Sequence, residues 1–438
     1  PGRMQFKSAM LLAGLFCLAG LAPAARAELQ IDITQGVTDP IPIAIVPFSR
    51  AVPADGGLDV SEVVRHDLDG SGRFRSMAIA SMLSQPTRAD DVQVADWRAA
   101  GNDYVLVGRV TATADGQLTV VAELVNALTG QRLGSTQLIA TAVNLRNAAH
   151  QVSDFVYQKL IGARGAFATR IAYVSVTGNI GAQRYSLLVA DADGENPKVI
   201  LDSDQPIMSP SWSADGQWLA YVSFENRISS IFVQRLRTGE RRQVSARVGV
   251  NGSPAWSPDG QRLALVLSGS GGNLDVYVLE LATQNLQRFT DNPAIDTEPV
   301  WSPDGSMLYF TSDRSGGPQI YRARLSAPER VERLTFGSSY NARARLSPDG
   351  KQLAYVTRVG SDYRIAVQDL ASGDMRVLSR GSLDESPSFA PNGMSVIYSA
   401  RQGELGVLAT VSVDGLVTQR LKSSQAEVRE PVWGPFTP

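Results

Sequence analysis

Catalysis and metal binding draw on a small set of side chains, and this sequence holds few of them in useful combinations. Its 438 residues include two histidines, His66 and His150, and one cysteine, Cys17. These counts exclude disulfide scaffolds and zinc sites built from cysteine and histidine. A serine hydrolase of the α/β type would need a G-x-S-x-G segment, which the sequence lacks. His150 falls in an amphipathic helical pattern, so we expect it on the surface.

Two short loops imitate ligand-binding motifs without completing them. Gly70-Ser71-Gly72 resembles part of a phosphate loop, but the lysine and the third glycine of such loops are absent. We therefore expect a turn between a helix and a strand there. Residues 191–196 (DADGEN) imitate a calcium loop, but Asp202 stands where that loop needs a glutamate. A hairpin turn between outer strands of a sheet is the better interpretation.

The second half of the chain is an internal repeat with a period of about 45 residues. Each copy follows the pattern Pro-x-Trp-Ser-Pro-Asp-Gly, with some substitutions. Asp-Gly is a strong hairpin signal, because the turn needs positive φ angles. The alternating apolar runs around it give four short strands per copy, which indicates a β-propeller. The copies cover residues 210–216, 254–260, 299–305, 344–350 and 387–393, with a partial copy at 431–435.

The number of copies predicts how the ring closes. Residues 171–175 match the run that follows an Asp-Gly turn, but no Pro-x-Trp strand precedes them. Residues 431–433 form such a strand with no hairpin partner after it. We infer that this C-terminal strand completes the blade that begins near Ile171, which leaves no open sheet edge. The prediction is a six-bladed propeller over residues 167–438, joined to the first half by a link at 162–166.

The first half, residues 41–161, is predicted to be a small α/β domain, which makes the whole a multidomain fold of α/β and all-β parts. Hydrophobic alternation indicates strands, and apolar residues at helical spacing indicate helices. Asp59 is a plausible helix cap. The expected strands cover 42–48, 104–113, 118–127 and 132–143, and the expected helices cover 58–68 and 145–160.

The first residues have the pattern of an export signal. A basic start at 4–7, an apolar run at 9–21 and the small-residue pattern Ala-Arg-Ala at 25–27 predict a secretory signal peptide cleaved after Ala27. Phe16 before Cys17 argues against a lipidation signal, which needs a small residue there.

The chain beyond this signal is expected to be periplasmic, without a membrane span, because no later apolar run approaches the length of a spanning helix. Residues 1–3 precede the initiator methionine that we infer, Met4. The formal net charge of −2, with no basic stripe, argues against a nucleic-acid partner. No cofactor or metal is indicated. Residues 28–40 follow the signal, and their polar and apolar alternation fits either an edge strand of the first domain or a detachable strand that pairs with another protein's sheet.

The residues that lead into each Pro-x-Trp strand are expected to ring one mouth of the channel, where the innermost strands of a propeller begin. Their charge is mixed, with an acidic excess. A solvated rim, with or without a cation in the channel, is the plainer interpretation, and a partner-binding face is the one that we favour. The segments are 208–209, 252–253, 296–298, 342–343, 384–386 and 429–430.

Together these features resemble the TolB family, the periplasmic components of Tol-Pal systems. The resemblance covers the chain from residue 28 onward. The repeat alone is not specific, but its combination with the signal peptide and the first domain is. The segments that carry it are 33–37 (ITQGV), 42–48 (PIAIVPF), 67–74 (DLDGSGRF), Trp97 and 101–108 (GNDYVLVG), beside the repeat itself.

The resemblance implies a non-enzymatic, monomeric adaptor that supports outer-membrane integrity and constriction at cell division. Such proteins bind the peptidoglycan-associated lipoprotein Pal at the propeller mouth and the C-terminal domain of TolA through their mature N-terminus. Colicins and other outer-membrane proteins are further implied partners. The implied Pal-binding residues are Val250, Asn251, Ser253, Thr297, Glu298, Arg343, Glu385 and Glu430. The implied TolA-binding residues are Glu28, Leu29, Gln30, Ile31, Asp32, Ile33, Thr34, Gln35 and Gly36.

Two positions depart from the family pattern. Val250 stands where members often carry histidine, and Arg343-Ala344 replaces the usual acidic entry that precedes a proline. We hypothesise that the two partner sites are coupled by linkage, which the short link at 162–166 would favour by limiting domain motion.

Two other function classes stay open from sequence. One is an exported propeller enzyme acting on glycans or peptides, for which Asp296, Glu298, Asp384 and Glu385 are the acid–base candidates. The other is a general scaffold for outer-membrane assembly.

Overall fold

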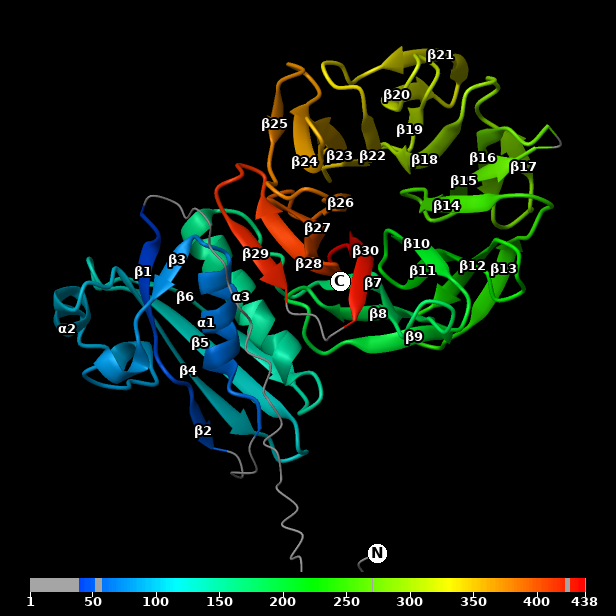
Figure 1. The fold of residues 1–438 in the computed structure, drawn as a ribbon. Coiled ribbons are helices and arrows are strands. Elements are labelled where there is room, and N and C mark those ends of the chain that lie inside the picture. The colour runs from blue at the N-terminus through cyan, green and yellow to red at the C-terminus, as the bar shows by residue number, and fades with distance from the viewer. Residues whose placement is uncertain (1–38, 52–56, 270, 422–425, 438) are drawn as a thin grey trace, which may run out of the picture.

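The computed structural model of the protein describes residues 39–51, 57–269, 271–421 and 426–437. A small α/β domain lies beside a ring of six four-stranded sheets, which confirms the predicted fold class (Figure 1). The predicted signal peptide and the segment 28–36 lie outside the described residues. None of the helices in the described ranges is long and apolar enough to cross a membrane.

Five of the six blades are continuous in sequence, and each is an antiparallel meander from the innermost to the outermost strand. The first two contain β10 (Ile207–Trp212), β11 (Trp218–Ser223), β12 (Ser230–Arg235) and β13 (Arg241–Ser245), then β14 (Asn251–Trp256), β15 (Arg262–Ser268), β16 (Leu274–Glu280) and β17 (Leu286–Arg288). The next two contain β18 (Asp296–Trp301), β19 (Met307–Ser312), β20 (Gln319–Arg324) and β21 (Ala327–Arg333), then β22 (Asn341–Leu346), β23 (Gln352–Val359), β24 (Asp362–Asp369) and β25 (Met375–Val377). The fifth contains β26 (Glu385–Phe389), β27 (Ser395–Gln402), β28 (Leu405–Ser412) and β29 (Thr418–Leu421).

The sixth blade joins the two ends of the propeller segment, as the repeat count predicts. Its strand order is β30-β7-β8-β9, so the last strand of the chain is innermost. Antiparallel pairing between β30 and β7 sets Val432 opposite Ala172 and Glu427 opposite Val176. The strands are β7 (Arg170–Thr177), β8 (Arg184–Asp191), β9 (Lys198–Ser203) and β30 (Glu427–Trp433).

The repeated tryptophan and Asp-Gly residues have structural roles. The Trp301 indole N–H donates to the Ala255 carbonyl of the neighbouring blade at 3.0 Å, and Trp212 reaches the Val432 carbonyl at 3.2 Å in the same way. In the turns, hydrogen bonds from Ser302 and Ser306 hold the pKa of Asp304 low, at about 2. The repeat therefore encodes blade-to-blade contacts and hairpins, not an array of catalytic carboxylates.

The first domain is a mixed sheet of order β3-β1-β4-β5-β6, with β2 paired to β4. Helices α1 and α3 cover one face and bury the main core, while Trp97 of α2 packs against the other face. The strands are β1 (Ile41–Ile45), β2 (Ser49–Ala51), β3 (Phe74–Ser76), β4 (Tyr104–Ala112), β5 (Leu118–Asn126) and β6 (Arg132–Ala140). The helices are α1 (Val60–Gly70), α2 (Val94–Ala99) and α3 (Leu145–Ile161), with short 3-10 turns at Ile79–Ser81 and Ala89–Asp91.

Local sequence signals account for the ends of these elements. The Asp59 side chain accepts from the Ser61 amide at 2.9 Å and caps α1, as expected. The predicted turn at Gly70–Gly72 joins α1 to β3, and Gly72 has a φ of 66°. The strand expected to reach Val143 ends instead at Ala140, because Asn144 accepts from the Thr141 amide and closes a turn there.

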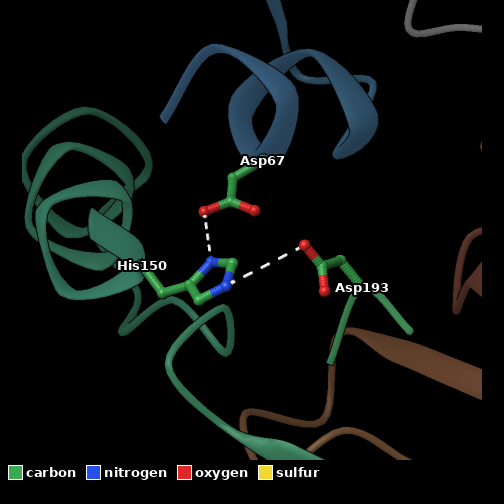
Figure 2. Close-up of side chains that lie close together, drawn as sticks. All are labelled: Asp67, His150 and Asp193. Atoms are coloured by element: carbon green, nitrogen blue, oxygen red, sulfur yellow. Dashed lines mark hydrogen bonds and ion pairs between the residues drawn. The ribbon is translucent and has the colours of Figure 1, made fainter. Parts of the chain in front are cut away.

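The prediction that His150 is a surface residue is wrong. His150 is only 2% exposed, and its Nδ1 lies 2.7 Å from Asp67 of α1 (Figure 2). Ser153 also donates to this carboxylate, at 2.6 Å. Burial opposes a charge on His150, but Asp67, Asp191 and Asp193 outweigh it and raise its pKa to about 10. The helical periodicity around His150 could not reveal Asp67, because this carboxylate comes from a distant part of the chain. Its hydrogen bond and charge stabilise the buried imidazole.

The helical side of the first domain faces the blade formed by β26–β29 (Figure 1). Arg73 pairs with Asp414 at 2.7 Å, and the Tyr157 hydroxyl lies 3.7 Å from the sulfur of Met394. The connection itself is anchored, because Asp154 of α3 accepts from the Phe167 amide at 2.8 Å. Burial raises the pKa of Asp154 to about 6 despite these amide contacts. Side chains of both domains thus hold the junction.

A charge placed on the closing strand tests how far the fold depends on ring closure. Val428 of β30 is 1% exposed, whereas Val199 on the outer strand of the same blade is 58% exposed. We expect Val428→Asp to lower the free energy of unfolding by at least about 3 kcal/mol, because it buries an unpaired carboxylate. Val199→Asp is the matched control and should unfold in urea like the wild type. Equal unfolding midpoints for the two variants would contradict the central role of β30.

Candidate functional site

The channel mouth is marked by one backbone feature that recurs in every blade. Six residues, each one position before the repeat's proline or its equivalent, have φ between 47° and 58°. All six line the central channel, which encloses about 870 Å³. We call these residues the mouth ring: Ser209, Ser253, Glu298, Arg343, Ser386 and Glu430.

The left-handed conformation of the mouth ring is unusual, since none of its members is glycine. Each member lies at a register shift between the innermost strand and its neighbour, such as the one between Thr297 and Val300. A non-glycine residue in this region costs about 1 kcal/mol or more. Such costs are concentrated where a fold presents side chains for binding. The recurrent strained backbone therefore makes the mouth the candidate functional site.

Hydrogen bonds between neighbouring blades join five of the six members of the mouth ring in two groups. The Arg343 amide donates to the Glu298 carboxylate at 2.9 Å, and the Arg343 Nε lies 3.2 Å from the same group. Arg343 also donates to the Ser386 hydroxyl of the next blade at 2.7 Å. Across the closing blade, the Ser209 amide donates to the Glu430 carboxylate. Hydrogen bonds thus connect residues of neighbouring blades at the mouth, and several of its charged groups already have partners.

The residues implied as Pal-binding fall into two groups. Ser253, Thr297, Glu298, Arg343 and Glu430 are partly exposed at the mouth, and Val250 and Glu385 are exposed. Asn251, in contrast, is 1% exposed, and its side-chain amide donates to the Arg247 carbonyl at 2.6 Å. Asn251 therefore shapes the loop before β14 and offers no free surface. The TolA-binding segment 28–36 lies outside the described residues.

The four candidate acid–base carboxylates do not converge on one reaction centre. Asp296 is fully buried, and both oxygens of its carboxylate accept hydrogen bonds from the Arg314 guanidinium, at 2.9 and 3.0 Å. Asp384 is also buried and accepts from the Gly381 amide at 2.9 Å, although burial raises its pKa. Glu298 is held by Arg343 as described. Only Glu385 is exposed, which leaves no pair of free carboxylates facing each other in the described channel wall.

Sequence reasoning named only Val250 among the exposed apolar side chains of the loops that lead into the innermost strands, and it missed three others. Val248 is 99% exposed and Phe336 is 65% exposed, and Ile295 and Val250 are also exposed. These four side chains lie in the loops that lead into β14, β18 and β22. The sequence signal that could have revealed them is a large apolar residue in each of these three loops, ahead of an innermost strand. We call Val248, Val250, Ile295 and Phe336 the apolar rim.

Comparison with known proteins identifies relatives of both halves of the chain. Residues 157–437 match the TolB beta propeller domain, and residues 29–133 match the TolB amino-terminal domain. A Methylococcus capsulatus protein named "Tol-Pal system protein TolB" is 53% identical over 409 residues, which covers 93% of this chain and 95% of that protein. A protein of the same name from Thioalkalivibrio sulfidiphilus is 51% identical and covers 96% and 97%.

A solved structure is similar over nearly the same length. The crystal structure of TolB from Acinetobacter baumannii superposes with a TM-score of 0.86 at 42% sequence identity. The match covers 93% of this chain and all of that one. The likeness therefore includes the first domain as well as the propeller.

The free-energy cost of the left-handed backbone can be measured at Ser253, a member of the mouth ring with a φ of 47°. Glycine adopts positive φ without strain, whereas a β-branched side chain is disfavoured there. We expect Ser253→Gly to raise the free energy of unfolding by about 0.5–1 kcal/mol and Ser253→Val to lower it by about 1 kcal/mol or more. Urea unfolding of the three proteins decides the matter. A glycine variant less stable than the wild type would show that the ring is not strained.

Proposed function

This chain belongs to the TolB family, and on that premise we propose that it is a non-enzymatic periplasmic adaptor of the Tol-Pal system. Its partners are proteins of that system. In the finer proposal, Pal binds at the propeller mouth and TolA binds the mature N-terminal segment, residues 28–36. The adaptor thereby supports outer-membrane integrity and constriction at division.

The observation that carries the Pal-binding proposal is the mouth ring, together with the exposed apolar rim in the loops that lead into β14, β18 and β22. Protein interfaces combine an apolar centre with polar groups at fixed positions. Because the strained backbone is already present in the free protein, its energetic cost is not subtracted from the binding free energy. Hydrogen bonds such as that from Arg343 to Ser386 hold polar groups of the ring in place before a partner arrives. Phe336 and Val248 supply exposed apolar area in the loops that lead into β22 and β14, strands that carry two members of the ring. This combination suits a protein partner better than a small substrate.

The state of the carboxylates supports an adaptor over an enzyme. General acid–base catalysis needs at least one free, positioned acid or base near the reacting atoms. Asp296 is committed to Arg314 and Glu298 to Arg343. Asp384 is buried with a backbone amide as its partner. These three carboxylates therefore serve the architecture of the loops and the ring. Glu385 is the one exposed member of the four, and it has none of the other three as a free catalytic partner.

The proposed coupling between the two partner sites would run through the domain junction. The helical face of the first domain contacts the blade of β26–β29, and that blade contributes Ser386 to the mouth ring. If Pal favours one position of the N-terminal segment, then TolA and Pal must change each other's affinity by the same factor.

Pal binding at the mouth is tested by removing an apolar rim side chain. We expect Phe336→Ser to weaken binding of the soluble Pal domain by about 10-fold, a loss of about 1.4 kcal/mol. Isothermal titration calorimetry on the chain from residue 28 measures it. Leu83→Ser is the matched control, because Leu83 is 77% exposed but lies on the first domain. Equal weakening by both variants, or no Pal binding by the wild type, would remove the proposed site.

The role of the N-terminal segment is tested by truncation. A chain that begins at Ile41 should lose TolA binding, because the proposed strand is gone. In the chain from residue 28, saturating Pal should change the dissociation constant of TolA, and TolA should change that of Pal by an equal factor. TolA binding that survives truncation would refute the segment's role. Equal TolA affinity with and without Pal would refute the coupling but leave both sites intact.

A further inference from the structure

A second polar cluster is buried where the two domains meet (Figure 2). His150 comes from α3 and Asp67 from α1 of the first domain. Asp191 and Asp193 come from the end of β8 and the turn toward β9 in the propeller. These are the residues whose spacing imitated a calcium loop in the sequence. The hairpin turn expected there is present, but its carboxylates point into the junction.

One nitrogen of His150 has no hydrogen-bond partner. Its Nδ1 is fixed by Asp67 at 2.7 Å, which leaves Nε2 facing the propeller. The nearest oxygens to Nε2 across the junction are Asp191 Oδ2 at 3.8 Å and Asp193 Oδ2 at 3.9 Å. Both distances exceed the range of a hydrogen bond, which ends near 3.2 Å. A buried ring nitrogen is therefore aimed at two carboxylate oxygens without touching either.

The two distances from Nε2 leave room for an ion between the ring and either carboxylate, and the ligand atoms of Asp67, His150 and Asp193 lie within 4.8 Å of one another. Zinc–ligand distances of about 2.0–2.2 Å place two ligand atoms of one ion about 3–4 Å apart. A metal-bound imidazole commonly donates its other N–H to a carboxylate, which fixes the ring and raises its basicity. Asp67 stands in that position relative to His150. The arrangement is thus the carboxylate–histidine pair that often supports a metal ligand.

The charges of the cluster leave room for one further cationic group. The carboxylates of Asp67, Asp191 and Asp193 face the guanidinium of Arg146, whose Nε lies 3.2 Å from Asp191, and Arg170 also acts on Asp191. A metal ion bound to a neutral imidazole would offset the remaining negative charge. Without the ion, a proton on His150 would offset it. Arg146 competes for the same oxygens, so a bound ion would have to share them with it.

A cavity beside the cluster offers room for water ligands. It encloses about 100 Å³, and Asp67 and Asp193 form part of its wall. A site with three protein ligands normally completes its coordination with water or another small ligand. The imidazole nitrogen discriminates among ions, because Mg²⁺ and Ca²⁺ prefer oxygen ligands alone.

We propose that His150 Nε2, Asp191 and Asp193 bind one divalent transition-metal ion, with zinc as the first candidate and Asp67 as a positioning residue. The absence of cysteine pairs excluded only cysteine–histidine sites, so this histidine–carboxylate set is consistent with the composition. The ion would tie the β8–β9 hairpin of the propeller to α3 of the first domain. The proposal does not depend on Pal or TolA binding.

The test is calorimetric titration of the untagged chain from residue 28 with Zn²⁺ and, separately, with Mg²⁺. Zn²⁺ should bind one-to-one and raise the thermal unfolding temperature, while Mg²⁺ should do neither. Asp67→Asn should weaken Zn²⁺ binding about 10–100-fold by releasing the imidazole. His150→Gln and Asp191→Asn should abolish the zinc-dependent shift. Co²⁺ added to the wild type should give a visible absorption band that is absent in Asp191→Asn.

The chain supplies its own matched control. His66 is its only other histidine, and its unpartnered Nε2 lines the same cavity, but it is not among the proposed ligands. His66→Gln should bind Zn²⁺ with unchanged affinity. Zinc binding lost in His66→Gln and kept in His150→Gln would overturn the assignment. Absence of zinc binding by the folded wild type would leave His150 as a protonated bridge and refute the metal site. If His150→Gln fails to fold, Asp191→Asn and the Co²⁺ spectrum still decide.

Discussion

The pairing of β30 with β7 is the constraint on which the rest of the molecule depends. It joins the last strand of the chain to the strand that begins the propeller, and it removes the open edges that a six-sheet arc would expose. The channel, the mouth ring and the blade-to-blade tryptophan contacts exist only in the closed ring. The contact of Trp212 with the Val432 carbonyl crosses this closing blade. Closure also positions the β8–β9 hairpin against the first domain, because β8 and β9 extend the same sheet.

The mouth and the domain junction use polar groups in different ways. At the mouth, partly exposed charges such as Glu298 and Arg343 satisfy one another across blades and hold a strained backbone open to solvent. At the junction, Arg146 of the first domain pairs with the buried Asp193 of the propeller, where an unpaired charge would be costly. The first arrangement suits the presentation of a surface to a protein. The second suits the fixing of a relative orientation.

Much of the fold was predictable from the sequence because the information is local and repeated. The Asp-Gly turns, the tryptophan register and the helix cap at Asp59 each act over a few residues, and the repeat states the propeller pattern several times. The parts that were wrong or missed depend on contacts between distant residues. His150 was assigned to the surface because its partner Asp67 is 83 positions away. Asn251 looked available for binding, although its side chain holds the adjacent loop. The left-handed mouth residues include Ser, Glu and Arg, so no residue type signals them.

The late position of β30 in the chain has a consequence for biogenesis. Glu430 is one of the six members of the mouth ring, and its carboxylate is the one that holds the Ser209 amide. No growing or translocating chain that stops before β30 can present a complete mouth, however well its earlier blades have folded. A partner that recognises the whole ring would therefore ignore unfinished molecules. If the mouth is the partner-binding surface proposed above, binding there would report that synthesis of the propeller is complete.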